Sequence, residues 1–411
     1  MFLTKLALKN LVRHRNRTLV TASIIAVAVF IFIVFDSLLG GMTQMSYNNI
    51  VDYESGHLQV VKQEYWAEKD KLPLENLLST DQELLAEVKN LAGYQASSPE
   101  VNFQARLNTG TRQLPVVGKG IIPQRFNRVF ELEDQFVAGS MFTAGEREAV
   151  MGKRLAQQLN LELGDYITLL VKDANETFNT ISAEISGLVS TANPQVNRNF
   201  VYLPLNYVQQ SLAIGDQVSK LIVTLDDRDQ AAEAADSLKS RLKQPPNLTV
   251  IAWDQLEAVS IAASKHAANK VILLIILLIA AIAIINTVIL AALERMNEIG
   301  MMKALGLRNK EIVYTFVVES TGIGIVGGSV GIILGALGVW GLSSYGLDFA
   351  GLYGVDMGTF GIPVIGKFYG TWNLTTFLQV FGFAVIVSLL SSILPAYWAA
   401  DKDQVEAIEH R

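Results

Sequence analysis

The chain of 411 residues lacks cysteine altogether, and its four histidines are scattered along the sequence. A disulfide framework and a zinc site made of cysteine and histidine are therefore not expected. Charged residues are also few, at 18%, whereas soluble globular proteins carry about 25%. The net charge of −6 lacks the basic excess with which proteins neutralise nucleic-acid phosphates, so no nucleic-acid partner is expected.

Motifs of ATP binding and metal-dependent catalysis are missing too. The sequence contains no phosphate-binding loop and no His-Glu-x-x-His string. The nearest candidate, Met151-Gly152-Lys153-Arg154, lacks the preceding glycine and the following Ser or Thr of a phosphate loop. We therefore expect a chain that is not an enzyme by itself, binds no metal and holds no cofactor of its own.

Four apolar stretches are long enough to cross a membrane, which takes about 20 apolar residues. They cover residues 19–40, 267–293, 312–342 and 374–400. The first follows a basic N-terminus and is longer than the core of a signal peptide, so we interpret it as a retained signal anchor. The expected fold is an α-helical membrane protein with four transmembrane helices.

The basic residues predict the orientation, because short loops rich in Lys and Arg stay in the cytoplasm. The loop 294–311 carries four of them, whereas the loop 343–373 carries only Lys367. We therefore expect 1–18, 294–311 and 401–411 in the cytoplasm, and 41–266 and 343–373 in the periplasm. The protein is expected in the inner membrane of a bacterium, surrounded by membrane lipid.

The long segment 41–266 is polar and acidic, with 20 Lys and Arg against 28 Asp and Glu. Helical patterns occur at 81–91, 147–161 and 230–243, and strand patterns at 166–171, 181–189, 200–203 and 220–225. This alternation predicts a large α+β domain of one or two lobes. The polar and aromatic segment 60–72 fits either a surface arm or a strand near the membrane.

The loop 294–311 contains a short string, Glu298–Leu305, that predicts an amphipathic helix with Ile299, Met302 and Leu305 on one face. Gly306 is suited to end this helix, because glycine adopts the left-handed backbone that closes many helices. A short helix between two spans can be held by a cytoplasmic partner protein. It can equally be an ordinary basic loop whose side chains reach toward the lipid headgroups.

This string resembles the coupling segment of the FtsX/MacB-type ABC transporter permeases, E-I-G-x-x-(R/K)-A-x-G. Three further regions are similar to that family: 139–171, the glycine pattern between Glu319 and Gly335, and the C-terminal string that begins at Leu394, although Gln404 replaces the usual proline. The order of one span, a large ectodomain and three spans is also the family's. The resemblance implies a MacB-like periplasmic core domain in 41–266.

The resemblance also implies that the loop docks on a separate cytoplasmic ATPase. The residues assigned to this coupling are Glu294, Glu298, Ile299, Gly300, Met302, Lys303, Ala304, Leu305 and Gly306. A dimer of the ATPase would supply ATP and Mg, and a second permease chain, identical or paralogous, would complete the transporter. The implied mechanism is mechanotransmission, in which closure of the ATPases moves the spans and the ectodomains.

Several residues of the spans allow two interpretations each. Gly327, Gly331 and Gly335 recur every fourth residue and predict a seam of close helix packing. Glu319 lies within the third span and is either a functional or a structural group. Five bulky side chains around the first span contact either the acyl chain of a substrate or ordinary lipid; they are Phe30, Phe32, Phe35, Met42 and Met45.

Within the family, the chain resembles the lipoprotein-releasing, Lol-type branch in its length and in the string Gly56-His57-Leu58-Gln59-Val60. That implies transfer of a lipoprotein from the inner membrane to a periplasmic chaperone. A polar turn with Pro194, Gln195 and Asn197 is a candidate contact for the chaperone. Two alternatives stay open: MacB-like export of peptides, toxins or drugs with a periplasmic adaptor, and a signalling scaffold that activates an envelope hydrolase.

Overall fold

The structure is a computed structural model, and it describes residues 2–13, 15–110, 112–143, 146–242, 247–294, 296–348 and 367–401. Most of the loop 343–373 and the tail beyond Asp401, including Gln404, lie outside the described residues. The chain forms two compact units. A membrane unit is built from Met1–Gln44, Ser264–Asp348 and Lys367–Arg411, and an ectodomain unit contains Met45–Ala263.

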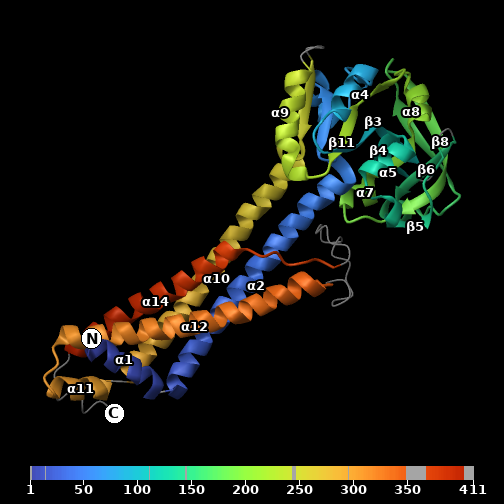
Figure 1. Cartoon of the computed structure of the whole chain (residues 1–411). Coiled ribbons are helices and arrows are strands. Elements are labelled where there is room, and N and C mark those ends of the chain that lie inside the picture. The colour runs from blue at the N-terminus through green and yellow to red at the C-terminus, as the bar shows by residue number, and fades with distance from the viewer. Residues whose placement is uncertain are drawn as a thin grey trace. The chain divides into compact units, whose positions relative to one another are not determined.

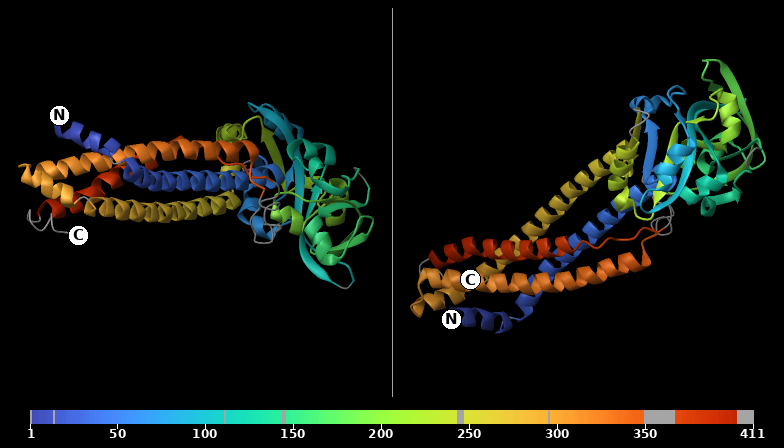
Figure 2. Two further views of the ribbon diagram at one scale, coloured as in Figure 1. Left: turned by 90° about the horizontal axis from the view of Figure 1, so that it is seen from below. Right: turned by 45° about the horizontal axis from the view of Figure 1, so that its top comes forward.

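The membrane unit consists of helices, and the described part of the chain has four that are long and apolar enough to span a bilayer. Their spanning segments are Thr18–Ser55, Ala268–Ala291, Asn309–Tyr345 and Leu374–Trp398. The expected four transmembrane helices are therefore confirmed (Figures 1 and 2). The helices are α1 (Phe2–Arg13), α2 (Arg15–Ile50), α10 (Glu257–Leu293), α11 (Met296–Ala304), α12 (Asn309–Tyr345) and α14 (Leu374–Asp401).

Helix α2 is longer than the apolar stretch 19–40 that it contains. It continues to Ile50 and ends in a wide turn, η1 (Val51–Ser55), in which the backbone is π-helical. Helix α10 likewise begins at Glu257, ten residues before the apolar stretch 267–293. The apolar composition of the sequence shows which part of each helix can lie in lipid. The helix itself is longer, because the polar residues next to this part do not interrupt a helix.

Helix α12 packs closely against α2 through a row of glycines. A methyl group added at Gly327 would lie 2.7 Å from the Ala22 carbonyl oxygen, and one at Gly331 would lie 2.8 Å from the Ala26 carbonyl oxygen. At Gly335 the corresponding methyl would lie 2.8 Å from a side-chain carbon of α2. Absence of a side chain at these positions is what lets the two backbones approach.

A second row of glycines on α12 faces α14. A methyl group at Gly324 would lie 2.8 Å from Ser388 Cβ, and one at Gly328 would lie 2.9 Å from the ring of Phe381. Glycines of α12 therefore allow close contact with both α2 and α14 (Figure 2).

The ectodomain unit is built on one large mixed sheet. Ten strands follow the order β12-β1-β11-β3-β4-β9-β6-β8-β5, with β7 paired to both β3 and β8. A separate pair joins β2 and β10. The strands are β1 (Leu58–Lys62), β2 (Leu78–Ser79), β3 (Tyr94–Asn108), β4 (Gln113–Ile121), β5 (Phe136–Gly139), β6 (Glu148–Gly152), β7 (Tyr166–Lys172), β8 (Phe178–Val189), β9 (Phe200–Pro204), β10 (Gln217–Val218), β11 (Lys220–Leu225) and β12 (Leu248–Ala252).

Short helices cover this sheet and complete two apolar cores. The larger core packs α4, α6, α8 and α9 onto the sheet. The smaller one surrounds Phe126 of α5 and Phe130, which directly follows α5, and the Phe126 ring contacts those of Phe130 and Tyr202. Helix α9 lies against β12, and α7 lies against β6 (Figure 1). The helices are α3 (Gln63–Ala67), α4 (Gln82–Lys89), α5 (Pro123–Val129), α6 (Lys153–Leu159), α7 (Pro194–Asn199), α8 (Leu205–Leu212) and α9 (Ala231–Arg241).

Most predicted elements of the ectodomain are present, but two predictions need correction. The predicted helix 147–161 is strand β6 in its first half, because Glu148–Gly152 pairs with β8 and β9 before α6 begins at Lys153. The segment 60–72, expected as either a surface arm or a strand near the membrane, is a strand only at its start. Its first residues belong to β1, which is paired on both sides, and α3 follows at Gln63.

Candidate functional site

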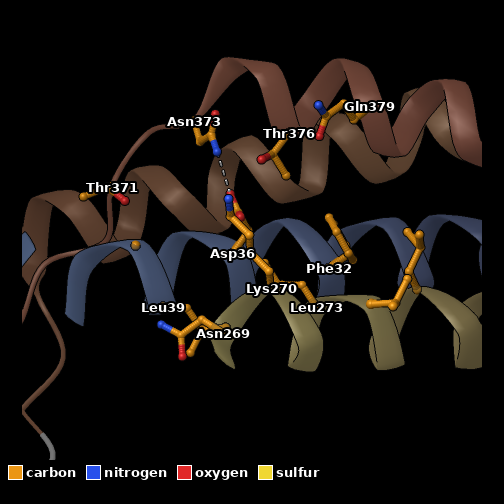
Figure 3. A pocket seen from close by; sticks show the side chains of 13 residues that line it. Phe32, Asp36, Leu39, Asn269, Lys270, Leu273, Thr371, Asn373, Thr376 and Gln379 are labelled. Carbon is orange, nitrogen blue, oxygen red and sulfur yellow. Dashed lines mark hydrogen bonds between the residues drawn. The ribbon is translucent and has the colours of Figure 1, made fainter. Parts of the chain in front are cut away.

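A pocket of about 450 Å³ lies in the membrane unit, between α2, α10 and the start of α14 (Figure 3). All three helices contribute the same end of their spans: α2 the end of its apolar stretch, α10 and α14 the beginning of theirs. The lining residues are Phe32, Asp36, Leu39, Gly40, Asn269, Lys270, Leu273, Leu274, Leu277, Thr371, Asn373, Thr376 and Gln379.

One side of the pocket is polar. The Asn373 side-chain amide donates a hydrogen bond of 3.3 Å to the Asp36 carboxylate, which links α2 to the start of α14 (Figure 3). Asn269 donates from α10 to the Thr43 hydroxyl of α2 at 3.5 Å. Lys270 lines the same space, and among the residues that the structure describes it forms no ion pair. The polar residues of the pocket are therefore a carboxylate (Asp36), an ammonium group (Lys270) and the amides of Asn269 and Asn373.

The other side of the pocket is apolar. Phe32 and Leu39 come from α2, and Leu273, Leu274 and Leu277 come from successive turns of α10. Ionisable groups within membrane spans are costly and mark binding sites or pathways more often than packing positions. A pocket that has polar side chains from all three helices and an aliphatic wall of Leu273, Leu274 and Leu277 is suited to a molecule that has a polar head and a hydrocarbon chain.

Of the five side chains predicted to contact an acyl chain, only Phe32 lines this pocket. Phe30 packs near Gly338 of α12, Phe35 is 43% exposed, and neither Met42 nor Met45 belongs to the lining. Contact of these five side chains with an acyl chain stays a prediction. The signal in the sequence that corresponds to the pocket is a polar residue at the same end of three separate apolar stretches.

The predicted coupling helix is present as α11. Its apolar residue Ile299 is fully buried and packs with Ile312 and Phe316 of α12 and with Ala396 and Ala400 of α14. Helix α11 is therefore seated on the ends of two spans, at the same end of the unit as α1 (Figures 1 and 2).

Gly306 ends this helix. Its backbone is left-handed, with φ of +92°, and its N–H donates to the Lys303 carbonyl while the Leu307 N–H donates to the Met302 carbonyl. These two bonds form a Schellman closure, which satisfies the last carbonyl groups of a helix. Met302 and Leu307 both pack on the cluster around Ile299.

The expected apolar face of α11 is correct for Ile299 and Met302 and wrong for Leu305. Leu305 lies beyond the last helical residue, Ala304, and is 81% exposed. Glu294, Glu298 and Lys303 engage in interactions within the structure, so none of them is a free charge. Gly300 is buried and Ala304 is exposed. Among the residues assigned to coupling, the exposed ones are thus Glu294 at the start and Ala304, Leu305 and Gly306 at the end.

Glu319, the ionisable residue of the third span, is buried in α12 and only 6% exposed. It is one turn from Thr315 and next to Ser320, which are also buried. Thr321 does not bond to it, since the Thr321 hydroxyl donates to the Val317 carbonyl of its own helix.

The polar turn predicted to face a chaperone is bonded to the turn that follows α2. Asn197 is buried, and its side chain bridges both main-chain groups of Thr191, at 2.8 Å and 2.7 Å. Asn193 donates to the Glu54 carboxylate at 3.0 Å, and Glu54 belongs to the turn that follows α2. Pro194 starts α7, and Gln195 is exposed. A buried Asn197 cannot itself contact another protein.

A buried charge cluster lies in the sheet of the ectodomain. Glu100 is fully buried and forms ion pairs with Lys119 at 3.2 Å and Lys220 at 3.3 Å. Burial alone would raise the pKa of Glu100, but the two lysines hold that pKa below its ordinary value. Lys119 also lies 4.3 Å from the centre of the Phe200 ring. Such a cluster is costly to break, because removal of one partner strands a buried charge.

Together, a four-span membrane unit, a large α+β domain inserted after the first span, and a packed amphipathic helix between the second and third spans define a transporter permease. Family models agree with this description. The MacB-like periplasmic core domain matches residues 18–241, and the FtsX-like permease C-terminal domain matches residues 270–403. The chain belongs to the FtsX/MacB-type ABC transporter permease family.

Curated relatives are similar over most of the chain. The lipoprotein-releasing system transmembrane protein LolC of Xylella fastidiosa (strain 9a5c) is 23% identical over 76% of this chain and 77% of the relative. LolE of Haemophilus influenzae is 25% identical over 74% of each chain. The macrolide export ATP-binding/permease protein MacB of Shewanella sp. (strain ANA-3) is 21% identical over 98% of this chain and 60% of the relative.

Among solved structures, the periplasmic region of MacB from Actinobacillus actinomycetemcomitans matches with a TM-score of 0.35 and 16% identity, over 50% of this chain and 92% of that one.

Proposed function

We propose that this permease releases lipoproteins from the inner membrane and passes them to a periplasmic chaperone, using ATP hydrolysis in a separate cytoplasmic ATPase. The observation that carries the proposal is the amphipathic pocket of the membrane unit. Its leucine wall suits an acyl chain, and the polar side chains of Asp36, Lys270 and Asn373 suit the polar groups that join acyl chains to a polypeptide. Similarity to the LolC and LolE proteins supports the same substrate class.

The movement that drives release would pass through α2. This helix is continuous from the pocket residues Phe32 and Asp36 to Ile50, and the turn after it is bonded to Asn193. Because α12 is locked to α2 by glycines, a push on α11 and α12 would move α2 with them. Two such chains, clamped by an ATPase dimer, would open and close the pocket together.

The test is a photo-crosslinker placed at Leu274, which lines the pocket, with Ile272 as the matched control. Both residues lie on α10 at nearly the same depth and are about half exposed, but Ile272 is not part of the lining. In cells that carry radiolabelled palmitate, we expect an acylated protein to be captured at Leu274 and not at Ile272. Addition of ATP and a chaperone to membranes should reduce this product.

Two results would contradict the proposal. Equal capture at the two positions would mean that the labelled protein is only dissolved in the surrounding lipid. Capture of a soluble peptide or a drug at Leu274, with lipoproteins still reaching their destination when the permease is depleted, would favour MacB-like export.

A further inference from the structure

A second cavity, in the ectodomain unit, collects positive charge. It has a volume of about 300 Å³ and lies between the end of α4, the first residues of β3 and α5. We call it the basic groove. Its lining residues are Leu85, Lys89, Tyr94, Gln95, Ala96, Ser97, Arg125 and Arg128.

The basic groove contains three cations and no acidic lining residue, although the segment around it is acidic. Lys89, Arg125 and Arg128 are all exposed, and within the described residues none of them forms an ion pair. Arg125 and Arg128 are three residues apart on α5, so they project from the same face of that helix. In a segment with 28 acidic and 20 basic residues, three neighbouring cations without a counter-charge form a site of opposite sign to their surroundings.

One wall of the basic groove is the first part of β3. Strand β3 pairs with β11 from Tyr94 to Glu100, whereas on its other side β4 pairs with it only from Glu100 onward. Along the described residues, no strand lies beside the β4 side of residues 94–99, and α5 packs against this part of β3 (Figure 1). Residues 96–99 are buried, so β3 offers the side chains of Tyr94 and Gln95 to a ligand and no free main-chain edge.

The side chains of this wall add polar and apolar contacts. The hydroxyl groups of Tyr94 and Ser97 are hydrogen-bonded to each other at 3.0 Å, and Leu85 provides an aliphatic surface next to them. Gln95 donates to the Asp226 carboxylate at 2.9 Å, and Asp226 itself is not among the lining residues.

We infer that the basic groove binds an acidic polypeptide segment of a client protein. Guanidinium groups bind carboxylates in a two-pronged geometry, so Arg125 and Arg128 would hold two acidic side chains of the segment. Leu85 and the Tyr94 ring would contact the apolar atoms of the segment. A phosphate ion would use the cations alone and leave Leu85 without a role. The inference concerns the ectodomain only and is independent of lipoprotein release.

The experiment uses the full chain in lipid nanodiscs and a fluorescent peptide of alternating Ser and Glu. The reference peptide has Gln in place of every Glu. By fluorescence anisotropy, we expect the acidic peptide to bind about two- to thirtyfold more tightly than the neutral one, because two exposed ion pairs each contribute modestly. Binding should weaken as salt is raised, since salt screens exposed charges.

Two pairs of variants locate the site. Arg125→Gln combined with Arg128→Gln should lower the affinity for the acidic peptide about tenfold. Lys153→Gln combined with Lys239→Gln changes the net charge equally, at exposed positions outside the groove, and should leave the affinity unchanged. Because a loss can also come from misfolding, Arg125→Glu combined with Arg128→Glu is included and should instead bind a Ser-Lys peptide.

An equal loss in the Lys153 and Lys239 control would show that the peptide senses only net charge and would overturn the inference. A wild-type chain that binds inorganic phosphate but does not distinguish the two peptides would overturn it as well, in favour of a simple anion site.

Discussion

The seam between α12 and α2 can be tested by a single methyl group. At Gly331 this methyl would lie 2.8 Å from the Ala26 carbonyl oxygen and 2.6 Å from Val29 Cβ. A backbone oxygen cannot rotate away, so the two helices must separate. Overpacking of this kind costs about 1–3 kcal/mol, and we expect Gly331→Ala to lower the free energy of unfolding of the membrane unit by that amount.

The same helix supplies a matched control. A methyl group at Gly341 would have no atom within 4 Å, and Gly341 also belongs to α12. Alanine is favoured over glycine inside a helix by up to about 1 kcal/mol, so Gly341→Ala should be neutral or stabilising. Because both glycines lie in α12, this gain is common to the two variants, which should therefore differ by the overpacking cost of about 1–3 kcal/mol, or several degrees in Tm.

The assay is thermal unfolding of the purified full chain in one detergent, followed by hydrogen exchange in peptides from α2 and α12. Faster exchange confined to these two helices in Gly331→Ala would match the reasoning. A Tm for Gly331→Ala equal to that of the unchanged chain, or an equal loss in Gly341→Ala, would refute it, because the close approach would then have no energetic consequence.

Two further predictions concern the charge cluster and the coupling segment. Glu100→Gln keeps the shape but leaves two buried lysines without a carboxylate, so the ectodomain should lose about 3–5 kcal/mol of stability. Glu176→Gln, which removes an exposed ion pair with Lys172, should lower the stability of the ectodomain by no more than about 1 kcal/mol. Limited proteolysis across a temperature series compares the two variants. Equal resistance of both variants to the protease would contradict the expectation. Leu305→Asp should leave the Tm unchanged, because Leu305 is exposed, but should reduce co-purification of the ATPase at least about tenfold, since burying a leucine contributes about 1.5–3 kcal/mol. Normal co-purification would show that the ATPase does not use this end of α11.

Sequence and structure agree best where the controlling property is local. A membrane span requires an uninterrupted apolar length, which can be counted along the chain, and the four predicted spans are all helices. The end of α11 is similarly local, because Gly306 supplies the left-handed backbone that the closure needs. The glycine seam on α12 is visible as a period of four, although the sequence does not say that α2 is the partner.

Predictions from the sequence agree least with the structure where contacts with a distant segment determine the local conformation. Residues 148–152 have a helical pattern but form β6, because pairing with β8 and β9 outweighs local preference. Leu305 fits the apolar face of a continued helix, yet the helix stops one residue earlier. Asn197 looks like a residue of an exposed polar turn and is buried, since the turn closes on itself and holds the end of α2 through Asn193.

The sequence by itself determined the class of this protein: four spans, an acidic α+β insertion after the first, and a coupling string after the second. Only the tertiary structure decided where a ligand could bind. The membrane pocket joins residues 32–40, 269–277 and 371–379, and the basic groove joins residues 85–97 to α5. The length of an apolar stretch and the position of a helix-ending glycine depend only on residues that are neighbours in the sequence, so the sequence alone predicts them. A pocket depends on which distant side chains meet, and packing alone settles that.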